Sequence, residues 1–391
     1  MTDVSSPAPA HPAAPGPAPA PPRGGLGFGL FFFAAVGDGA TEAYRLLLAS
    51  AARADALGFD FVSTPERHFH RFGGAFPNPA VTSAALAAVT RRVQLRAGSV
   101  VTPLHHPARV VEDFAVVDGI SGGRAAICVG SGWNVNDFVL APDAYATRRE
   151  RVVADIAAIR RAWSSGRWTG RGPGGDEVEL DLFPRPVQRE LPLWITASRS
   201  EETFREAGRL GTNVLTHLEN QDLDALTGKI AAYRRARAEA GFDAGRVTVM
   251  MHTYVADTDD AARAVAVPWL KRYLLTAIDL EARAVGAGGS MSGGRQGRDF
   301  MTRQEARERL AELGVNRYLD GTSLIGSVER CAGVAARVRA AGADEIACLV
   351  DFVGDTDTVL DGLDRLNAVR ERCGADVDAG AGVSVGAGAG V

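Results

Sequence analysis

The sequence predicts an α/β fold, a (β/α)8 TIM barrel that forms a single domain. Short apolar segments alternate regularly with segments of helical periodicity, and eight such units fit within about 350 residues. The apolar segments are also hydrophobic on both faces, as the strands of a buried parallel sheet are. A chain of 391 residues is long enough for one such domain.

The first half of the chain contains four of these strand–helix units. An apolar run at 26–33 precedes a segment with helical spacing, and Gly58 closes that helix as a C-cap. Pro107 suits the first turn of a later helix, where its missing N–H costs no hydrogen bond. The strands are expected at 26–33, 59–64, 93–101 and 124–129, and the helices at 41–57, 78–89, 107–120 and 147–165.

The second half continues the alternation with longer interruptions. Its strands are expected at 193–196, 213–216, 247–255 and 345–350, and its helices at 200–210, 222–240, 258–284, 328–341 and 356–372. Two stretches, 166–188 and 285–317, are interpreted as loops inserted into the barrel because they open with Gly-rich sequence. The barrel domain then covers 24–374. A Pro/Ala-rich N-terminal tail at 1–23 and a Gly/Ala-rich C-terminal tail at 375–391 are expected to be disordered.

Composition argues against several classes of partner. With a net charge of −4 and a pI of about 6.0, the chain lacks the basic excess that binds nucleic acid or an anionic membrane. The first residues lack the apolar segment of a signal peptide, and no apolar stretch reaches the roughly 18 residues of a membrane span. The four cysteines lie far apart, without metal-type spacing. We therefore expect a cytoplasmic protein with reduced thiols and with no nucleic-acid or membrane partner.

Ionisable side chains crowd the segment 66–74, which follows the second expected strand. In a (β/α)8 barrel the C-terminal strand ends carry the chemistry, so this cluster marks a candidate site. One interpretation is a metal site, whose ligands would be Glu66, His68, His70, His217 and Asp351. A barrel hydrolase of that kind would have its His-x-His pair after the first strand and a bridging lysine on a middle strand. The two lysines here lie in predicted helices, so we favour a site without metal.

Two other segments contain partial nucleotide-binding motifs. The stretch 130–135 has two glycines after a strand but lacks the last glycine of a dinucleotide fingerprint. The stretch 196–202 joins a strand to a helix, where Ser198 and Glu201 are compatible with a capping box. The same helix N-terminus, with its hydroxyl groups and Arg199, is equally compatible with binding a phosphate monoester.

Several separate motifs, in the same order, resemble those of bacterial luciferase and its relatives, the luciferase-like monooxygenases, which are flavin enzymes on a TIM barrel. The resemblance covers residues 27–366 and rests on the segments 66–69, 78–79, 102–107, 111–113 and 128–132. Four further segments are similar to a MupA-type subfamily of FMN-dependent enzymes of natural-product biosynthesis. They are 132–142, 183–188, 215–218 and 344–349.

The resemblance implies that reduced FMN lies across the C-terminal mouth of the barrel. Its phosphate would bind at the turn 198–200, and a cis peptide bond is expected within 98–100, beneath the flavin ring. Cys128 would belong to the pocket wall and would not act as a nucleophile. The cofactor-binding residues implied are Gly98, Ser99, Cys128, Trp133, Asn134, Tyr145, Ser198, Arg199 and Ser200.

The resemblance also implies three catalytic residues, Arg67, His68 and His217. Luciferase has a catalytic histidine where this chain has Arg67, so the acid–base role of that histidine does not carry over. A guanidinium donates hydrogen bonds, whereas an imidazole gains and loses a proton near neutral pH. Arg67 is therefore expected to stabilise a peroxide anion, while His68 or His217 transfers protons.

The implied function is oxygenation of an organic natural-product intermediate, supplied as a free small molecule or bound to a carrier protein. Reduced FMN (FMNH2) from a separate flavin reductase would react with O2 to give a C4a-hydroperoxyflavin, and the enzyme would act as a homodimer. Two alternatives stay open. The same fold supports F420-dependent oxidoreductases, and a non-catalytic barrel would bind flavin or a partner protein without turnover.

Overall fold

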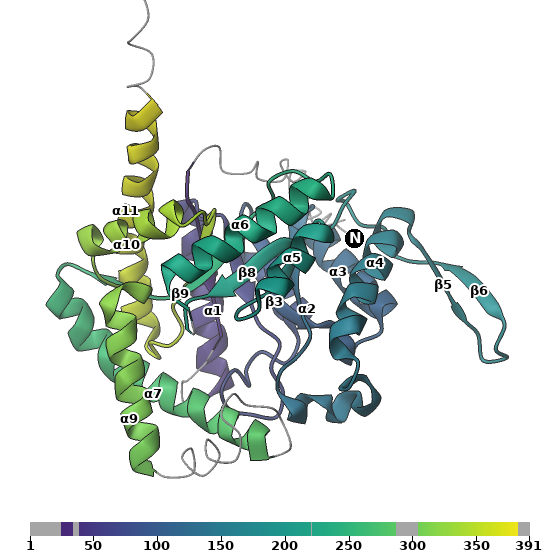
Figure 1. The fold of residues 1–391 in the computed structure, drawn as a ribbon, viewed down its shortest axis with the longest axis horizontal. Coiled ribbons are helices and arrows are strands. Elements are labelled where there is room, and N and C mark those ends of the chain that lie inside the picture. The colour runs from purple at the N-terminus through teal and green to yellow at the C-terminus, as the bar shows by residue number, and fades with distance from the viewer. Residues whose placement is uncertain (1–24, 34–38, 220, 287–303, 382–391) are drawn as a thin grey trace, which may run out of the picture.

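The structure is a closed barrel of eight parallel strands with helices packed around it, as the sequence predicts (Figure 1). The computed structural model describes residues 25–33, 39–219, 221–286 and 304–381. The strands follow one another around the barrel in chain order, and the ring closes because the last of them pairs with the first. They are β1 (Gly27–Phe31), β2 (Phe61–Thr64), β3 (Gln94–Val101), β4 (Ala125–Gly130), β7 (Leu193–Thr196), β8 (Asn213–His217), β9 (Val247–Ala256) and β11 (Glu345–Leu349).

Apart from α9 and the extended end of α11, the helices occupy the predicted segments, with small shifts at their ends. Local signals explain two of these ends. Gly58 closes the first helix with a φ of 85°, and the Asn78 side chain accepts hydrogen bonds from two amides of the second. The helices are α1 (Ala40–Leu57), α2 (Pro79–Val89), α3 (Pro107–Ser121), α4 (Arg148–Ser165), α5 (Glu201–Arg209), α6 (Leu223–Glu239), α7 (Asp259–Gly286), α9 (Gln304–Arg317), α10 (Val328–Ala340) and α11 (Thr356–Ala381).

The first predicted loop insertion is a β-hairpin. Strands β5 (Arg167–Arg171) and β6 (Glu177–Asp181) pair antiparallel and project from the body of the molecule on the right of Figure 1. Both strands are largely exposed, and Arg167 forms an ion pair with Glu179 at 3.1 Å. The segment Glu177–Asp181 does alternate polar and apolar residues, as a strand does, but neither face of the hairpin is buried.

The second predicted insertion, 285–317, is wrong in its last part. Residues Gln304–Arg317 form α9, which packs against α7. A ninth parallel strand, β10 (Leu324–Ser327), then pairs with the C-terminal half of β9 outside the closed ring. The last helix also continues to Ala381, past the expected domain end at 374. The predicted N-terminal tail lies outside the described residues.

The N-terminal end of the barrel is closed by a buried ion pair. Arg96 in β3 contacts Glu345 at the start of β11 through two hydrogen bonds of 2.6 and 2.9 Å. The Arg96 guanidinium lies between the rings of Phe61 and Trp194, 3.7 and 4.1 Å from their centroids. Burial would raise the pKa of Glu345, but Arg96 and a hydrogen bond from Thr248 outweigh it and lower that pKa to about 2.

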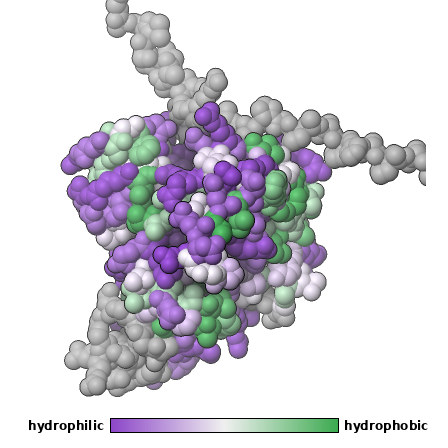
Figure 2. All heavy atoms as spheres, turned by 90° about the vertical axis from the view of Figure 1, so that its right-hand side faces the viewer, coloured by the Kyte–Doolittle hydropathy of each residue, from purple (hydrophilic) through white to green (hydrophobic). Residues whose placement is uncertain are grey.

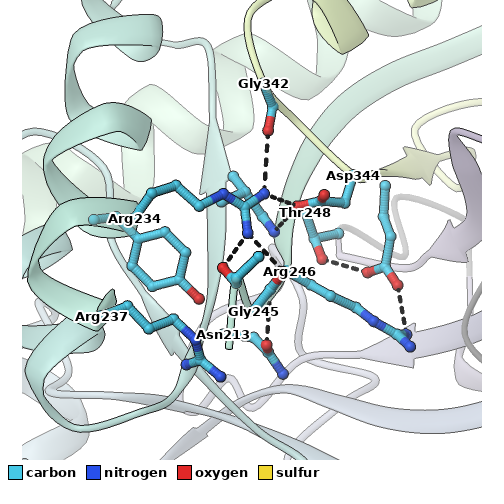
Figure 3. A network of polar contacts seen from close by, with 12 residues as sticks. Asn213, Arg234, Arg237, Gly245, Arg246, Thr248, Gly342 and Asp344 are labelled. Atoms are coloured by element: carbon cyan, nitrogen blue, oxygen red, sulfur yellow. Dashed lines mark hydrogen bonds and ion pairs between the residues drawn. The ribbon is translucent and has the colours of Figure 1, made fainter. Parts of the chain in front are cut away.

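A second polar network lies beside this ion pair, at the loops that precede β8, β9 and β11 (Figure 3). Arg234 forms an ion pair with Asp344 at 2.6 Å, and Arg246 reaches Glu345 at 3.2 Å. The Asn213 side chain accepts a hydrogen bond of 2.9 Å from the Arg246 amide. These contacts fill the N-terminal end of the barrel with structural interactions, so the functional groups gather at the opposite end.

The surface of the molecule is mixed in polarity. Figure 2 shows small hydrophobic patches separated by hydrophilic residues on the side from which the hairpin projects. Exposed apolar residues in and after the hairpin are Leu180, Phe183 and Val187. In the part of the chain that the structure describes, no helix is both long and apolar enough to cross a membrane.

Candidate active site

The predicted site residues meet at the C-terminal mouth of the barrel, because parallel strands deliver their C-terminal ends to the same rim. The segment 66–68 follows β2, Gly98 and Ser99 lie in β3, and Cys128 lies in β4. Trp133 and Asn134 follow β4, the turn 198–200 follows β7, and His217 ends β8.

Glu66 was considered from the sequence only as a metal ligand. In the structure it accepts three hydrogen bonds on the β2 side of the mouth. One carboxylate oxygen accepts hydrogen bonds from His68 at 2.9 Å and His105 at 2.6 Å, and the other accepts from the Val101 amide at 2.7 Å. Burial would raise the pKa of Glu66, but these partners lower it. Burial would lower the pKa of His105, but Glu66 raises it. The pair is a charged carboxylate and a readily protonated imidazole.

Arg67 lies at the centre of an aromatic cage. Its guanidinium carbon is 5.0 Å from the ring centroid of Phe33, 5.9 Å from that of Phe72 and 5.5 Å from that of Trp133. Burial lowers the pKa of Arg67, and the nearby Asp137 opposes this effect. The cage thus joins the segment after β2 to the loop after β4.

The floor of the mouth is formed by Gly98 and Ser99. Their peptide bond is cis, as the resemblance implies. A Cβ on Gly98 would lie 2.3 Å from Ser63 Oγ and 2.9 Å from the Phe31 ring, so no side chain fits there. The Ser99 hydroxyl contacts that of Thr196, at the end of β7. The result is a floor of backbone and short side chains, on which a flat ring system can lie.

Cys128 pairs with Gly98 across β3 and β4 and is almost fully buried. Burial raises the pKa of its thiol to about 12, so the thiol stays protonated at neutral pH. A buried, protonated thiol does not suit a nucleophile.

The loop after β4 has one exposed and one buried predicted residue. Trp133 is half exposed above Arg67, whereas Asn134 is buried and donates a hydrogen bond of 2.7 Å to Asp137. Burial raises the pKa of Asp137 to about 6, despite the opposing charge of Arg67. Tyr145 lies farther along, where it packs on Phe138 and Arg148. Its observed contacts therefore belong to the support of this loop.

The turn after β7 presents the N-terminus of α5 to the mouth. Ser200, and not Ser198, is the N-cap, and its side chain makes no capping hydrogen bond. The capping-box interpretation is therefore wrong. Glu201 pairs with Arg205 at 2.6 Å, and the carboxylate of the next residue likewise pairs along the helix. The two carboxylates are thus turned away from the turn.

Lys229 of α6 is an unexpected neighbour of this turn. Its ammonium group donates hydrogen bonds to the Ser198 carbonyl at 3.3 Å and to Gln221 at 2.8 Å. A cation, a free helix N-terminus and two hydroxyl groups therefore meet at one place. This donor set suits a phosphate group.

His217 faces the same region from the end of β8. Its Nδ1 accepts a hydrogen bond of 3.3 Å from the Glu219 amide, so the proton of the neutral ring is on Nε2. Burial lowers the pKa of His217; Glu219 opposes this effect, and Arg199 and Lys229 add to it. His217 is thus a neutral imidazole that can accept a proton.

The candidate metal ligands do not converge. His68 contacts Glu66, whereas His70 contacts Asp279 of α7 at 3.3 Å. Asp351 accepts a hydrogen bond from the Phe33 amide at 2.8 Å. Within the described ranges, no group of three or more His, Cys, Asp or Glu side chains is placed to hold a metal ion.

Four residues of the mouth were not predicted as site residues from the sequence: His105, Asp137, Lys229 and Tyr273. Tyr273 comes from α7 and packs on Phe72 beneath the cage, with ring centroids 5.0 Å apart. Its contribution depends on how α7 crosses the barrel, which no local pattern reveals. Lys229 could have been noticed in the sequence, because it is one of only two lysines in a chain whose other basic side chains are mostly arginines.

Comparisons with known proteins identify the family of this chain. The family model for luciferase-like monooxygenases matches residues 26–345. The chain is 31% identical over 222 residues to the oxygenase component of the flavin-dependent trigonelline monooxygenase of Acinetobacter baylyi. That match covers 54% of this chain and only 59% of the relative. An F420-dependent glucose-6-phosphate dehydrogenase of Beutenbergia cavernae is 32% identical over 232 residues, covering 56% and 67% of the two chains.

Solved structures show the same fold. The oxygenating constituent of 3,6-diketocamphane monooxygenase from Pseudomonas putida, in complex with FMN, superposes with a TM-score of 0.70 at 19% identity, covering 89% of this chain and 98% of that one. The monooxygenase RslO1 from Streptomyces bottropensis gives a TM-score of 0.68 at 22% identity, covering 88% and 98%. With a family model that matches most of its length, the chain belongs to the luciferase-like monooxygenase family.

Proposed function

We propose that this protein is a monooxygenase that uses reduced FMN and O2 to oxygenate an organic substrate. The proposal is supported by two features that lie together at the C-terminal mouth of the barrel. A side-chain-free floor at Gly98 suits a flavin ring, and the donor-rich N-terminus of α5 suits its phosphate. The bound flavin would supply the electrons that activate O2.

The phosphate would be held by the first turn of α5. The amides of Glu201 and Glu202 have no acceptor within the helix, and the helix dipole favours an anion there. Arg199 and Lys229 add positive charge at the turn, and the hydroxyls of Ser198 and Ser200 complete the proposed set.

The ring would lie on Gly98 and Ser99, with Cys128 in the wall below. Trp133, half exposed above the mouth, would shield it from water. Tyr145 would support the same loop. His217 would accept protons, while His68 and His105, both bonded to Glu66, would hold or return them.

The experiment that tests this function compares cofactors. The purified protein is given reduced FMN, by a flavin reductase, or reduced F420, and binding and O2 consumption are followed. Tight binding of FMN with protein-dependent O2 consumption supports a monooxygenase. Preference for F420 without O2 consumption would support the oxidoreductase alternative, which the Beutenbergia relative favours. Flavin binding without any change in peroxide release would indicate a non-catalytic barrel.

Replacing Lys229 by methionine is expected to weaken FMN binding by about tenfold, because the turn loses a cation and the hydrogen bond that holds the Ser198 carbonyl. The matched control is Lys271→Met. Lys271 pairs with Glu312 between α7 and α9, so its loss should leave FMN affinity unchanged. Fluorescence titration measures the FMN affinity of each variant. Equal affinities in the two variants would remove Lys229 from the phosphate site.

We also propose the partners that the resemblance implies. These are a separate flavin reductase, as the name "oxygenase component" of the trigonelline relative supports, and a natural-product intermediate, free or carrier-bound. We propose a homodimer as well. It is supported by exposed apolar residues on two neighbouring helices, α2 and α3. They are Val81, Val89, Val116 and Ile120.

Ile120→Glu is expected to convert such a dimer to a monomer, because a charge would be buried at the contact. Light scattering after size exclusion measures the mass. Leu313→Glu on α9, equally exposed, is the control and should leave the mass unchanged. A wild-type protein that is monomeric at all concentrations would contradict the homodimer.

A further inference from the structure

Arg67 differs from every other buried arginine in the described part of the chain. Arg96 is paired with Glu345, Arg124 donates to backbone carbonyls and Thr90, and Arg237 binds Asp243. Arg67 is equally buried, with 5% of its surface exposed, yet its Nε has no hydrogen-bond partner among the described residues.

Leaving a buried charge without a partner is costly, so proteins pair such groups or use them for binding. The aromatic cage compensates only in part. Phe33, Phe72 and Trp133 lie 5.0 to 5.9 Å from the guanidinium carbon and can attract the cation through their rings. A ring accepts no in-plane hydrogen bond, so the Nε donor of the guanidinium stays unmatched among the described residues.

Asp137, whose charge acts on Arg67, does not take this role. It attracts Arg67 at longer range, but its carboxylate is engaged by the Asn134 amide at 2.7 Å, and the two make no ion pair. Glu66, the preceding residue, is saturated by two histidines and an amide. Among the described residues, neither of these carboxylates forms an ion pair with Arg67.

We propose that Arg67 binds an anionic group of the substrate, a carboxylate or an ionised phenol, and that Phe33 and Trp133 flank the planar part of that substrate. This inference rests on the proposed function, since it places the substrate at the same mouth. Half-exposed Trp133 covers the guanidinium from the solvent side, so its side chain would move to admit the anion. Arg67 therefore selects for charge, and the rings select for a flat molecule.

The proposal is tested with benzoate as a planar anionic probe and benzamide as its neutral counterpart. Calorimetric titration compares the wild type with Arg67→Met, Arg67→Lys and the control Arg71→Met, an exposed arginine of the same loop. We expect wild type and Arg71→Met to bind benzoate at least about tenfold more tightly than benzamide. Arg67→Met should lose this preference, and Arg67→Lys should retain part of it.

Thermal melting supplies a second readout. If Arg67 serves binding, Arg67→Met should melt at an equal or higher temperature, because it removes a buried unpaired charge. A lower melting temperature together with an unchanged benzoate preference would show a structural role and overturn the proposal.

Two further outcomes separate the possible sources of failure. If the wild type binds FMN but its affinities for benzoate and benzamide are equal, this inference fails and the proposed function stands. If Arg67→Met weakens the binding of reduced FMN while leaving benzoate binding intact, the anion belongs to the flavin, which also overturns the inference. Absence of FMN binding to the wild type is the separate failure of the proposed function.

Discussion

Replacing Glu345 by alanine is expected to lower the free energy of unfolding by ~3–5 kcal/mol, because it leaves Arg96 charged and unpaired inside the barrel. The Glu345 side chain is fully buried, and its four contacts come from three different strands or loops. Denaturant unfolding of the wild type and the variant measures the difference.

Glu312→Ala is the matched control for this prediction. Glu312 forms an ion pair of 2.9 Å with Lys271, but both side chains are exposed, so the loss should stay within ~1 kcal/mol. Equal effects of the two substitutions would show that the buried pair contributes no more than a surface pair.

The buried pair of Arg96 and Glu345 also predicts that stability depends on pH in the acid range. The pKa of Glu345 falls from 4.5 to about 2 on folding, so its contribution is complete above pH 4.5 and is lost as the pH falls toward 2. As the pH falls from 4.5 toward 2, the Glu345→Ala variant should therefore lose less stability than the wild type. Parallel loss in both proteins would contradict the assignment.

Gly98→Ala is expected to abolish most FMN binding and to destabilise the protein by ~1–3 kcal/mol. The added methyl group would meet Ser63 Oγ at 2.3 Å and the Phe31 ring at 2.9 Å, in the floor where the flavin ring is proposed to lie. Fluorescence titration and thermal melting measure the two effects.

Two variants make this prediction specific. Gly119→Ala lies in α3 with no atom within 4 Å of the new methyl group, so it should be neutral or stabilising by up to ~1 kcal/mol. Adding Ser63→Ala to Gly98→Ala should restore part of the stability, because it removes the nearer clash. A Gly98→Ala protein with normal stability and normal FMN affinity would show that the floor is not constrained.

The sequence was sufficient to predict the barrel because its strands are buried on both faces and separated by well-marked helices. The expected strand at 193–196, for example, is found with the same bounds as β7. The hairpin β5–β6 and the helix α9 were missed for the same reason. Both lie in stretches that open with Gly-rich sequence and were interpreted as loops, although Glu177–Asp181 alternates polar and apolar residues.

For the site, the sequence located the segments but not their partners. The resemblance indicated the cis bond at Gly98 and the turn at Ser198, which lie at one mouth. It did not indicate that Glu66 joins two histidines, or that the Nε of the caged Arg67 has no acceptor among the described residues. These contacts join residues that follow β1, β2, β3 and β4, so they depend on barrel closure and not on local pattern.

The most direct test of the account is a crystal structure of the protein in complex with FMN. We predict that the flavin ring lies over Gly98 and Ser99, with the phosphate bound by the first amides of α5 beside Ser198 and Ser200. FMN bound elsewhere, or at this mouth with its phosphate directed away from α5, would contradict the central claim.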